Sequence, residues 1–105
     1  MDKHPDVSPV RDLVSYQEGA IVSRMILKRD TGNVTLFAFD AGQELSEHTA
    51  PYDALAHVVD GEAAITVAGR PYRLHAGDMI IMPAHQPHAV KAASQFKMLL
   101  TMIRS

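Results

Sequence analysis

The chain of 105 residues contains no cysteine and no tryptophan. The absence of cysteine excludes disulfide bonds, thiolate catalysis, iron–sulfur clusters and cysteine-ligated zinc sites. Its only aromatic residues are three tyrosines and three phenylalanines, which are too few for a base-stacking platform. The formal net charge is −2 and no basic stretch occurs. We therefore expect no nucleic-acid partner, because such partners are held largely by phosphate contacts.

Long hydrophobic runs are also missing. No run of about 18 consecutive apolar residues, the length that a membrane-spanning helix requires, occurs in the sequence. The first residues mix charges, prolines and polar side chains, unlike a secretory signal peptide. We expect no membrane partner and a cytoplasmic location.

What the chain does contain is a composition typical of one soluble globular domain. Hydrophobic residues account for 47% and charged residues for 21%, close to the average for such proteins. Residues 1–19 carry prolines and scattered charges and are predicted to form an N-terminal arm. Residues 20–105 are predicted to form a single domain.

Short apolar segments, separated by turn residues, fill that domain. The segments have strand length rather than helix length, and residues 30–33 carry a hairpin signal. Further turns are expected at Gly61, Gly69 and Gly77. The pattern predicts an all-β antiparallel sandwich or barrel. A short C-terminal helix over residues 96–104 is the alternative for the last segment.

The unusual feature is the set of six histidines: His4, His48, His57, His75, His85 and His88. Strand alternation around His88 places Lys91 toward water and His88 toward the interior. An imidazole aimed into an apolar interior needs a hydrogen-bond partner or a metal, because an unpaired buried polar group costs about 1–3 kcal/mol. A hydrogen-bonded core histidine and a metal ligand are both compatible with this position.

The other histidines are less well placed by pattern. His48 lies in a polar stretch about forty residues before His88, so only a closed sheet brings the two together. His57 lies in a strand that is apolar on both faces, which leaves its direction open. His85 is expected in a turn between two prolines, His75 on the surface, and His4 in the arm without a role.

Two spacings resemble the conserved motifs of the cupin superfamily. In the first motif, Gly42, His48 and Gly61 match, whereas Ala50 and Ala54 occupy the positions of a second histidine and of a glutamate. In the second motif, Gly77, Pro83 and His88 match. His85 stands in place of a glycine, and Ala92 stands in place of an asparagine. The resemblance covers residues 20–104 and implies a single-domain cupin fold, a double-stranded β-helix of jelly-roll topology.

The resemblance also implies a metal site. Cupins with complete motifs hold one divalent metal, often iron, manganese, nickel or zinc, through three histidines and a glutamate. Only His48 and His88 of those four positions are kept here, and His57 or His85 would have to supply a third ligand. Alternation turns His57 away from the face of Ala54 unless a β-bulge intervenes.

The two alanines remove charge and open volume inside the expected barrel. We expect an apolar cavity with His48 and His88 as polar points and with three further wall residues, Phe96, Met98 and Met102. One hypothesis is a protein that binds a small molecule or a weakly held divalent metal without catalysis. A second is a dioxygenase-like metal enzyme that uses His48, His88 and a third histidine.

A third hypothesis is a metal-free isomerase or epimerase in which His48 or His88 is the general base. Such a base needs an orienting acid, for which Glu44, Glu47 and Asp53 are candidates.

The resemblance finally implies a homodimer, formed through a sheet face or an exchanged N-terminal strand. Five apolar residues of the arm are expected to be buried on a partner and to cover a sheet edge; they are Val7, Val10, Leu13, Val14 and Tyr16. The expected partners are therefore a small-molecule ligand and a second copy of the chain.

Overall fold

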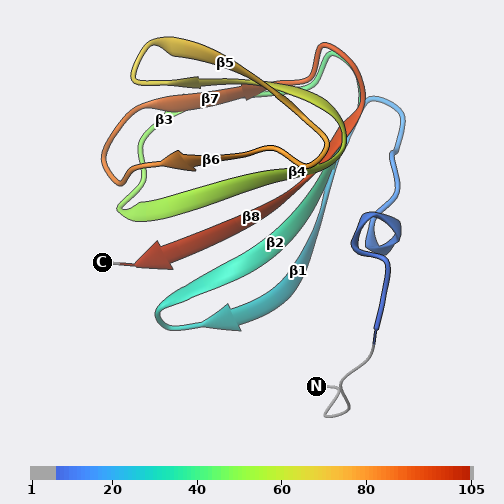
Figure 1. The fold of residues 1–105 in the computed structure, drawn as a ribbon, viewed down its shortest axis with the longest axis horizontal. Helices are drawn as coiled ribbons and strands as arrows, with labels where there is room; N and C mark the ends of the chain where they lie inside the picture. The colour runs from blue at the N-terminus through green and yellow to red at the C-terminus, as the bar shows by residue number, and fades with distance from the viewer. Residues whose placement is uncertain (1–6, 105) are drawn as a thin grey trace.

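The computed structural model describes residues 7–104, and β-strands dominate this part of the chain (Figure 1). A short 3-10 helix, η1 (Val10–Leu13), precedes the first strand. The strands are β1 (Ile21–Arg29), β2 (Gly32–Phe39), β3 (Glu44–His48), β4 (Tyr52–Val67), β5 (Arg70–His75), β6 (Met79–Met82), β7 (His88–Lys91) and β8 (Phe96–Arg104). The predicted all-β class is confirmed. The alternative of a C-terminal helix is wrong, because residues 96–104 form β8.

Two antiparallel sheets share the long strand β4. Its first half pairs with β6 and β8, and β8 continues through β2 to β1. Its second half pairs with β5 and β7, and β7 pairs with β3. Figure 1 shows that β4 curves back, so that both of its ends lie at the same end of the barrel. We call this end, which carries the loops 49–51, 68–69 and 83–87, the mouth.

Gly61 was predicted to lie in a turn between strands. It lies instead at a bend within β4. Its φ is 73°, and a Cβ added there would lie 2.2 Å from the carbonyl oxygen of Gln95. The pairing of β4 with β8 shifts register between Val58 and Asp60. A bulge beside a left-handed glycine bends the strand sharply, and this bend carries β4 from one sheet to the other.

Alternate residues of the strands fill the barrel. In the first half of β4, Ala54, Ala56 and Val58 are buried inside. The residues that alternate with them, Leu55, His57 and Val59, lie on the outer face and are partly exposed. Phe39 and Phe96 stack at the centre of the core, with ring centroids 4.6 Å apart. Burial of a side chain of this size stabilises the fold by roughly 1.5–3 kcal/mol. The interior is therefore a packed core.

The segment before β1 packs on the outer face of the first sheet. Val14 is buried there with Leu36 and Ala38, and Leu13 and Tyr16 pack against this cluster. The Tyr16 hydroxyl donates to Asp60 Oδ2 at 2.6 Å. Sequence reasoning placed Leu13, Val14 and Tyr16 on a partner chain. The structure packs them instead on the chain's own barrel, because that sheet face is itself apolar.

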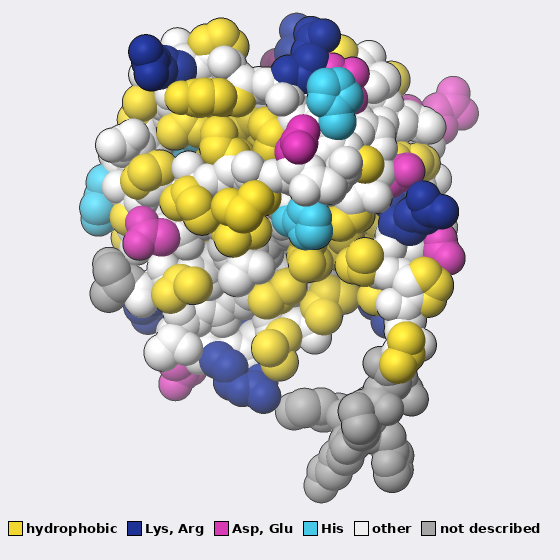
Figure 2. All heavy atoms as spheres, in the orientation of Figure 1, with side chains coloured by type: hydrophobic (Ala, Val, Ile, Leu, Met, Phe, Trp, Pro, Cys, Tyr) yellow, Lys and Arg dark blue, Asp and Glu magenta, His cyan; other side chains and the backbone are white. Residues whose placement is uncertain are grey.

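Hydrophobic side chains also remain exposed on the surface. Figure 2 shows them gathered over the face of the barrel, with charged side chains mostly toward the rim of the view. Exposed examples are Met79 and Ile81 on β6 and Ile103 on β8. Within residues 7–104, no helix has the length and apolarity needed to cross a bilayer.

Candidate functional site

His48 and His88 meet at the mouth of the barrel. They are Cα partners on the neighbouring strands β3 and β7. Their Nε2 atoms lie 3.1 Å apart, and the ring centroids are 4.3 Å apart with the planes inclined by 68°. His88 is buried, with 8% of its surface exposed, whereas His48 is exposed at the rim. One ring of the pair is therefore buried in the barrel, and the other is accessible to solvent.

Both rings have a backbone carbonyl beside Nδ1. His48 Nδ1 lies 2.8 Å from the carbonyl oxygen of Ser46, and His88 Nδ1 lies 3.3 Å from that of Gln86. A carbonyl oxygen only accepts, so a ring that donates to it does so from Nδ1–H and, when neutral, keeps a lone pair on Nε2. The 3.1 Å contact is therefore a pair of facing lone pairs when both rings carry the proton on Nδ1, and a hydrogen bond when one ring carries it on Nε2.

Burial keeps His88 in this neutral form. It lowers the pKa of His88 below the usual value, and the neighbouring His48 lowers it further. The Gln86 carbonyl opposes this effect. At neutral pH the Nε2 lone pair of His88 is thus available to a ligand.

Three hydrogen bonds hold the loop 83–87 over the mouth. The amide of Ala84 donates to Asp53 Oδ1 at 2.9 Å, and the amide of His85 donates to the carbonyl of Ala50 at 2.8 Å. The amide of Ala68 donates to the carbonyl of Pro87 at 2.8 Å. The loop that positions His88 is therefore tied to both ends of β4.

The other histidines do not join the pair. His57 lies on the outer face, because the bulge of β4 follows it and leaves its alternation with Ala54 unchanged. His85 is exposed in the loop, with a left-handed φ of 68°, which explains why a glycine is common at this position of the motif. The predictions of His57 or His85 as a third ligand are not met by this arrangement.

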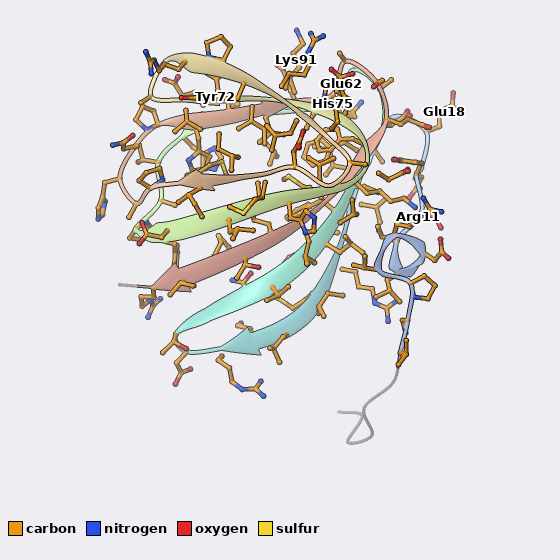
Figure 3. The ribbon with its side chains drawn as sticks, in the orientation of Figure 1. Arg11, Glu18, Glu62, Tyr72, His75 and Lys91 are labelled. Atoms are coloured by element: carbon orange, nitrogen blue, oxygen red, sulfur yellow. The ribbon has the colours of Figure 1, made fainter. Side chains whose placement is uncertain are left out.

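The remaining two histidines lie elsewhere. His75 is on the outer surface, where Nε2 lies 3.6 Å from Glu62 Oε1 and Nδ1 lies 3.7 Å from Asp78 Oδ2. Figure 3 shows His75 beside Glu62 near the top of the view. His4 lies outside the described residues.

Two of the three expected cavity residues are packed in the core. Phe96 and Met98 expose 0% and 1% of their surface. These two residues were expected to line an open cavity. They pack instead against other core side chains. Met102 is only partly buried. The inner wall nearest the mouth thus consists of Met102, Ala54 and a residue that sequence reasoning did not single out, Met82.

Met82 is buried, with 2% of its surface exposed, and is a Cα partner of Ala54. One signal in the sequence points to it. Met82 directly precedes the loop 83–87, and His88 directly follows that loop.

The carboxylates expected to orient a histidine base have other positions. Glu44 and Glu47 are exposed on β3, and Asp53 accepts the Ala84 amide. Both imidazoles are oriented by backbone carbonyls instead. The geometry therefore gives no support to the hypothesis of a carboxylate-assisted base.

A metal shell of three histidines and one glutamate does not fit these residues. Ala50 and Ala54 occupy two of the four positions, and within residues 7–104 no group of three or more His, Cys, Asp or Glu side chains is arranged to hold a metal. A shell of two imidazoles does fit. With metal–nitrogen distances of about 2.0–2.1 Å, a separation of 3.1 Å between the Nε2 atoms corresponds to an angle of about 100° at the metal.

Comparisons with known proteins agree with this architecture. A family model described as a cupin domain matches residues 35–104. A conserved protein of unknown function from Streptococcus pyogenes is 34% identical, with a TM-score of 0.93, over 99% of this chain and 91% of that one. A cupin superfamily protein from Desulfitobacterium hafniense is 28% identical, with a TM-score of 0.90, over 100% of this chain and 94% of that one.

A cupin 2 conserved barrel domain protein from Leptotrichia buccalis is 39% identical, with a TM-score of 0.86. The match covers 90% of this chain, which spans only 46% of the Leptotrichia protein. No curated protein matches the chain. The family model and the relative from Streptococcus, together with the barrel described above, show that the chain belongs to the cupin superfamily.

Proposed function

We propose that the mouth of the barrel is a binding site. In this proposal, His48 and His88 loosely hold one divalent transition metal, and a small molecule binds at the metal's remaining positions. The supporting observation is the pair of Nε2 atoms that face each other at 3.1 Å. When both rings donate from Nδ1, the two Nε2 lone pairs repel each other at this distance unless a cation lies between them.

The surroundings of the two rings favour a metal over a proton as this cation. Burial lowers the pKa of His88, so a proton is held poorly at neutral pH. Each Nδ1–H points at a backbone carbonyl, the arrangement that orients histidine ligands in metalloproteins. Borderline ions such as Ni²⁺ and Zn²⁺ accept imidazole ligands readily.

The small number of ligands determines how such a site works. A catalytic metal usually has three protein ligands, so two imidazoles hold an ion weakly and leave several positions open. When bound, the ion supplies a Lewis-acidic centre for oxygen or nitrogen donors of a small molecule. His48, exposed at the rim, leaves that molecule a path from solvent. A binding role without catalysis is the function that this arrangement supports best.

The test is a titration of the protein, purified without an affinity tag, with Ni²⁺ or Co²⁺. We expect one metal per chain, and an affinity at least about tenfold lower in His48→Ala and in His88→Ala, because each variant removes half of the donor pair. His57→Ala is the matched control, since this ring lies on the outer face, and its affinity should equal that of the wild type. Unchanged affinity in both ligand variants, or a wild-type protein that binds no metal, contradicts the proposal.

A further inference from the structure

The position at which a complete cupin motif has a glutamate lies between two methionines. Ala54, which stands at the glutamate position, lies on the inner face of β4 with 5% of its surface exposed. Its Cα partners are Met82 on β6 and Met102 on β8. Both methionines belong to inner-face positions of their strands. Two thioethers therefore lie on either side of the residue where a carboxylate would have been.

The same end of the barrel holds the histidine pair. Met82 and His88 are the two residues that flank the loop 83–87, and both are buried, at 2% and 8% exposure. That loop is bonded to Asp53, the neighbour of Ala54, and to Ala50. The curvature of β4 brings its two ends, which hold Ala54 and the His88 partner Val67, to the same end in Figure 1.

The charge of these side chains differs from that of a usual cupin shell. The thioethers carry no charge, alanines stand at two of the four motif positions, and the chain has no cysteine. An ion in this site meets no anionic ligand from the residues that replace the motif. A shell of this kind favours a cation of low charge, because it offers no carboxylate to offset the cost of removing a doubly charged ion from water.

The softness of the donors points the same way. Thioether sulfur is a soft ligand that selects Cu(I), and imidazole also suits copper. A methionine side chain has three rotatable bonds and adapts its sulfur position to a ligand.

From these observations we propose that the mouth is a soft-metal site, in which Met82 joins His48 and His88 as a third donor to a monovalent ion, Cu(I) or Ag(I). This inference rests on the proposed function, because it uses the same two imidazoles. It differs in naming the class of ion and a ligand that lies outside both cupin motifs.

The experiment compares two probes on the same variants. Ag(I), which is inert to redox change, and Cu(I), delivered anaerobically in competition with a chromogenic chelator, are titrated into the tag-free protein, and Ni²⁺ is titrated in parallel. The variants are Met82→Leu, Met79→Leu and His88→Ala. Leucine keeps the volume of methionine while removing the sulfur. Met79 lies on β6 as well but is exposed on the outer face, which makes it the matched control.

We expect Met82→Leu to lower the Cu(I) and Ag(I) affinities at least about tenfold and to leave Ni²⁺ binding unchanged, whereas Met79→Leu changes neither. X-ray absorption of the Cu(I) protein should show a sulfur neighbour that Met82→Leu removes. If Met82→Leu binds Cu(I) as the wild type does, the soft-metal inference is overturned, although loss of Ni²⁺ binding in His88→Ala would still support the proposed function. If His88→Ala binds both ions normally, both proposals fail.

Discussion

At the scale of single residues, His85 carries a strain that the mouth of the barrel imposes on it. Its φ of 68° lies in the left-handed region, which costs a residue with a side chain about 1–2 kcal/mol. The amide of His85 is bonded to Ala50, so the loop holds this conformation. The ring itself is exposed and takes no part in the histidine pair.

His85→Gly should therefore raise the free energy of unfolding, by about 1 kcal/mol, since glycine adopts this backbone freely. The affinity for Ni²⁺ should not change. Denaturant unfolding and metal titration measure the two quantities. Gln86→Gly, next in the chain at a position without positive φ, is the control and should be slightly destabilising. A loss of metal affinity in His85→Gly would show that His85 is a ligand after all.

Tyr16 supplies a pH dependence at the same scale. Burial, together with the hydrogen bond to Asp60 and the charge of that carboxylate, raises the pKa of Tyr16 well above the usual value of about 10. Above pH 10 the unfolded chain loses this proton while the folded chain keeps it. The free energy of unfolding should therefore fall as the pH rises above about 10.

Tyr16→Phe should remove this part of the alkaline destabilisation, because phenylalanine has no proton to lose. Unfolding followed between pH 8 and pH 11 measures the slope, and Tyr72→Phe, at an exposed position on β5, should keep the wild-type slope. Equal slopes in Tyr16→Phe and the wild type would show that the Tyr16–Asp60 bond does not form in solution.

At the scale of elements, the bend of β4 carries this strand from one sheet into the other. Gly61 has both a left-handed φ and no room for a Cβ, since the Gln95 carbonyl would be 2.2 Å away. Gly42 also has a positive φ, of 86°, but nothing lies within 4 Å of its Cβ position. An alanine at either position would have a strained backbone, but only at Gly61 would its Cβ also clash with a neighbouring strand.

Gly61→Ala should lower the free energy of unfolding by about 3 kcal/mol or more, because strain and a backbone clash add. Gly42→Ala should cost only about 1 kcal/mol, from strain alone. Urea unfolding of both variants compares the two values. Similar costs for the two substitutions would contradict the tight approach of β8 to the bend.

The strands also show how far the sequence predicts the site. His88 was placed correctly inside, because Lys91 marks the solvent face of β7. The direction of His57 was not predictable: Val59, on its own face of β4, packs against the segment that contains Val14. Because that outer face is also covered, apolar residues occur on both faces, and alternation loses its signal.

The position of Met82 was only partly predictable, for a different reason: its place just before the loop 83–87 can be read from the sequence, but its neighbours in the sheet cannot. Its position beside Ala54 depends on the pairing of β4 with β6, which no local pattern of residues specifies. The contact of His48 with His88 was predictable only through the spacing of the cupin motifs, since forty residues separate them.

At the scale of the whole molecule, we propose that exposed apolar residues form the interface of a homodimer. Met79, Ile81 and Ile103 are 50%, 49% and 59% exposed on the outer face of the first sheet. The hairpin beside it carries both Arg29 and Asp30. A surface with an apolar centre and charges of both signs at its rim is complementary to a copy of itself across a two-fold axis.

We therefore predict that Ile81→Glu weakens the dimer at least about tenfold, because it buries a charge in the interface. Sedimentation velocity over a range of concentrations measures the association. Tyr72→Glu, a comparably exposed position at 40% on the other sheet, should leave it unchanged. A wild-type chain that sediments as a monomer of 11.5 kDa at every concentration would contradict the prediction.

The histidine pair at the mouth underlies the whole account, and anomalous diffraction from crystals soaked in Ni²⁺ or Zn²⁺ examines it most directly. The account predicts a single strong peak between β3 and β7, about 2.0–2.1 Å from the Nε2 atoms of both His48 and His88. Metal peaks only at other histidines, with these two rings turned apart or joined through water, would contradict it.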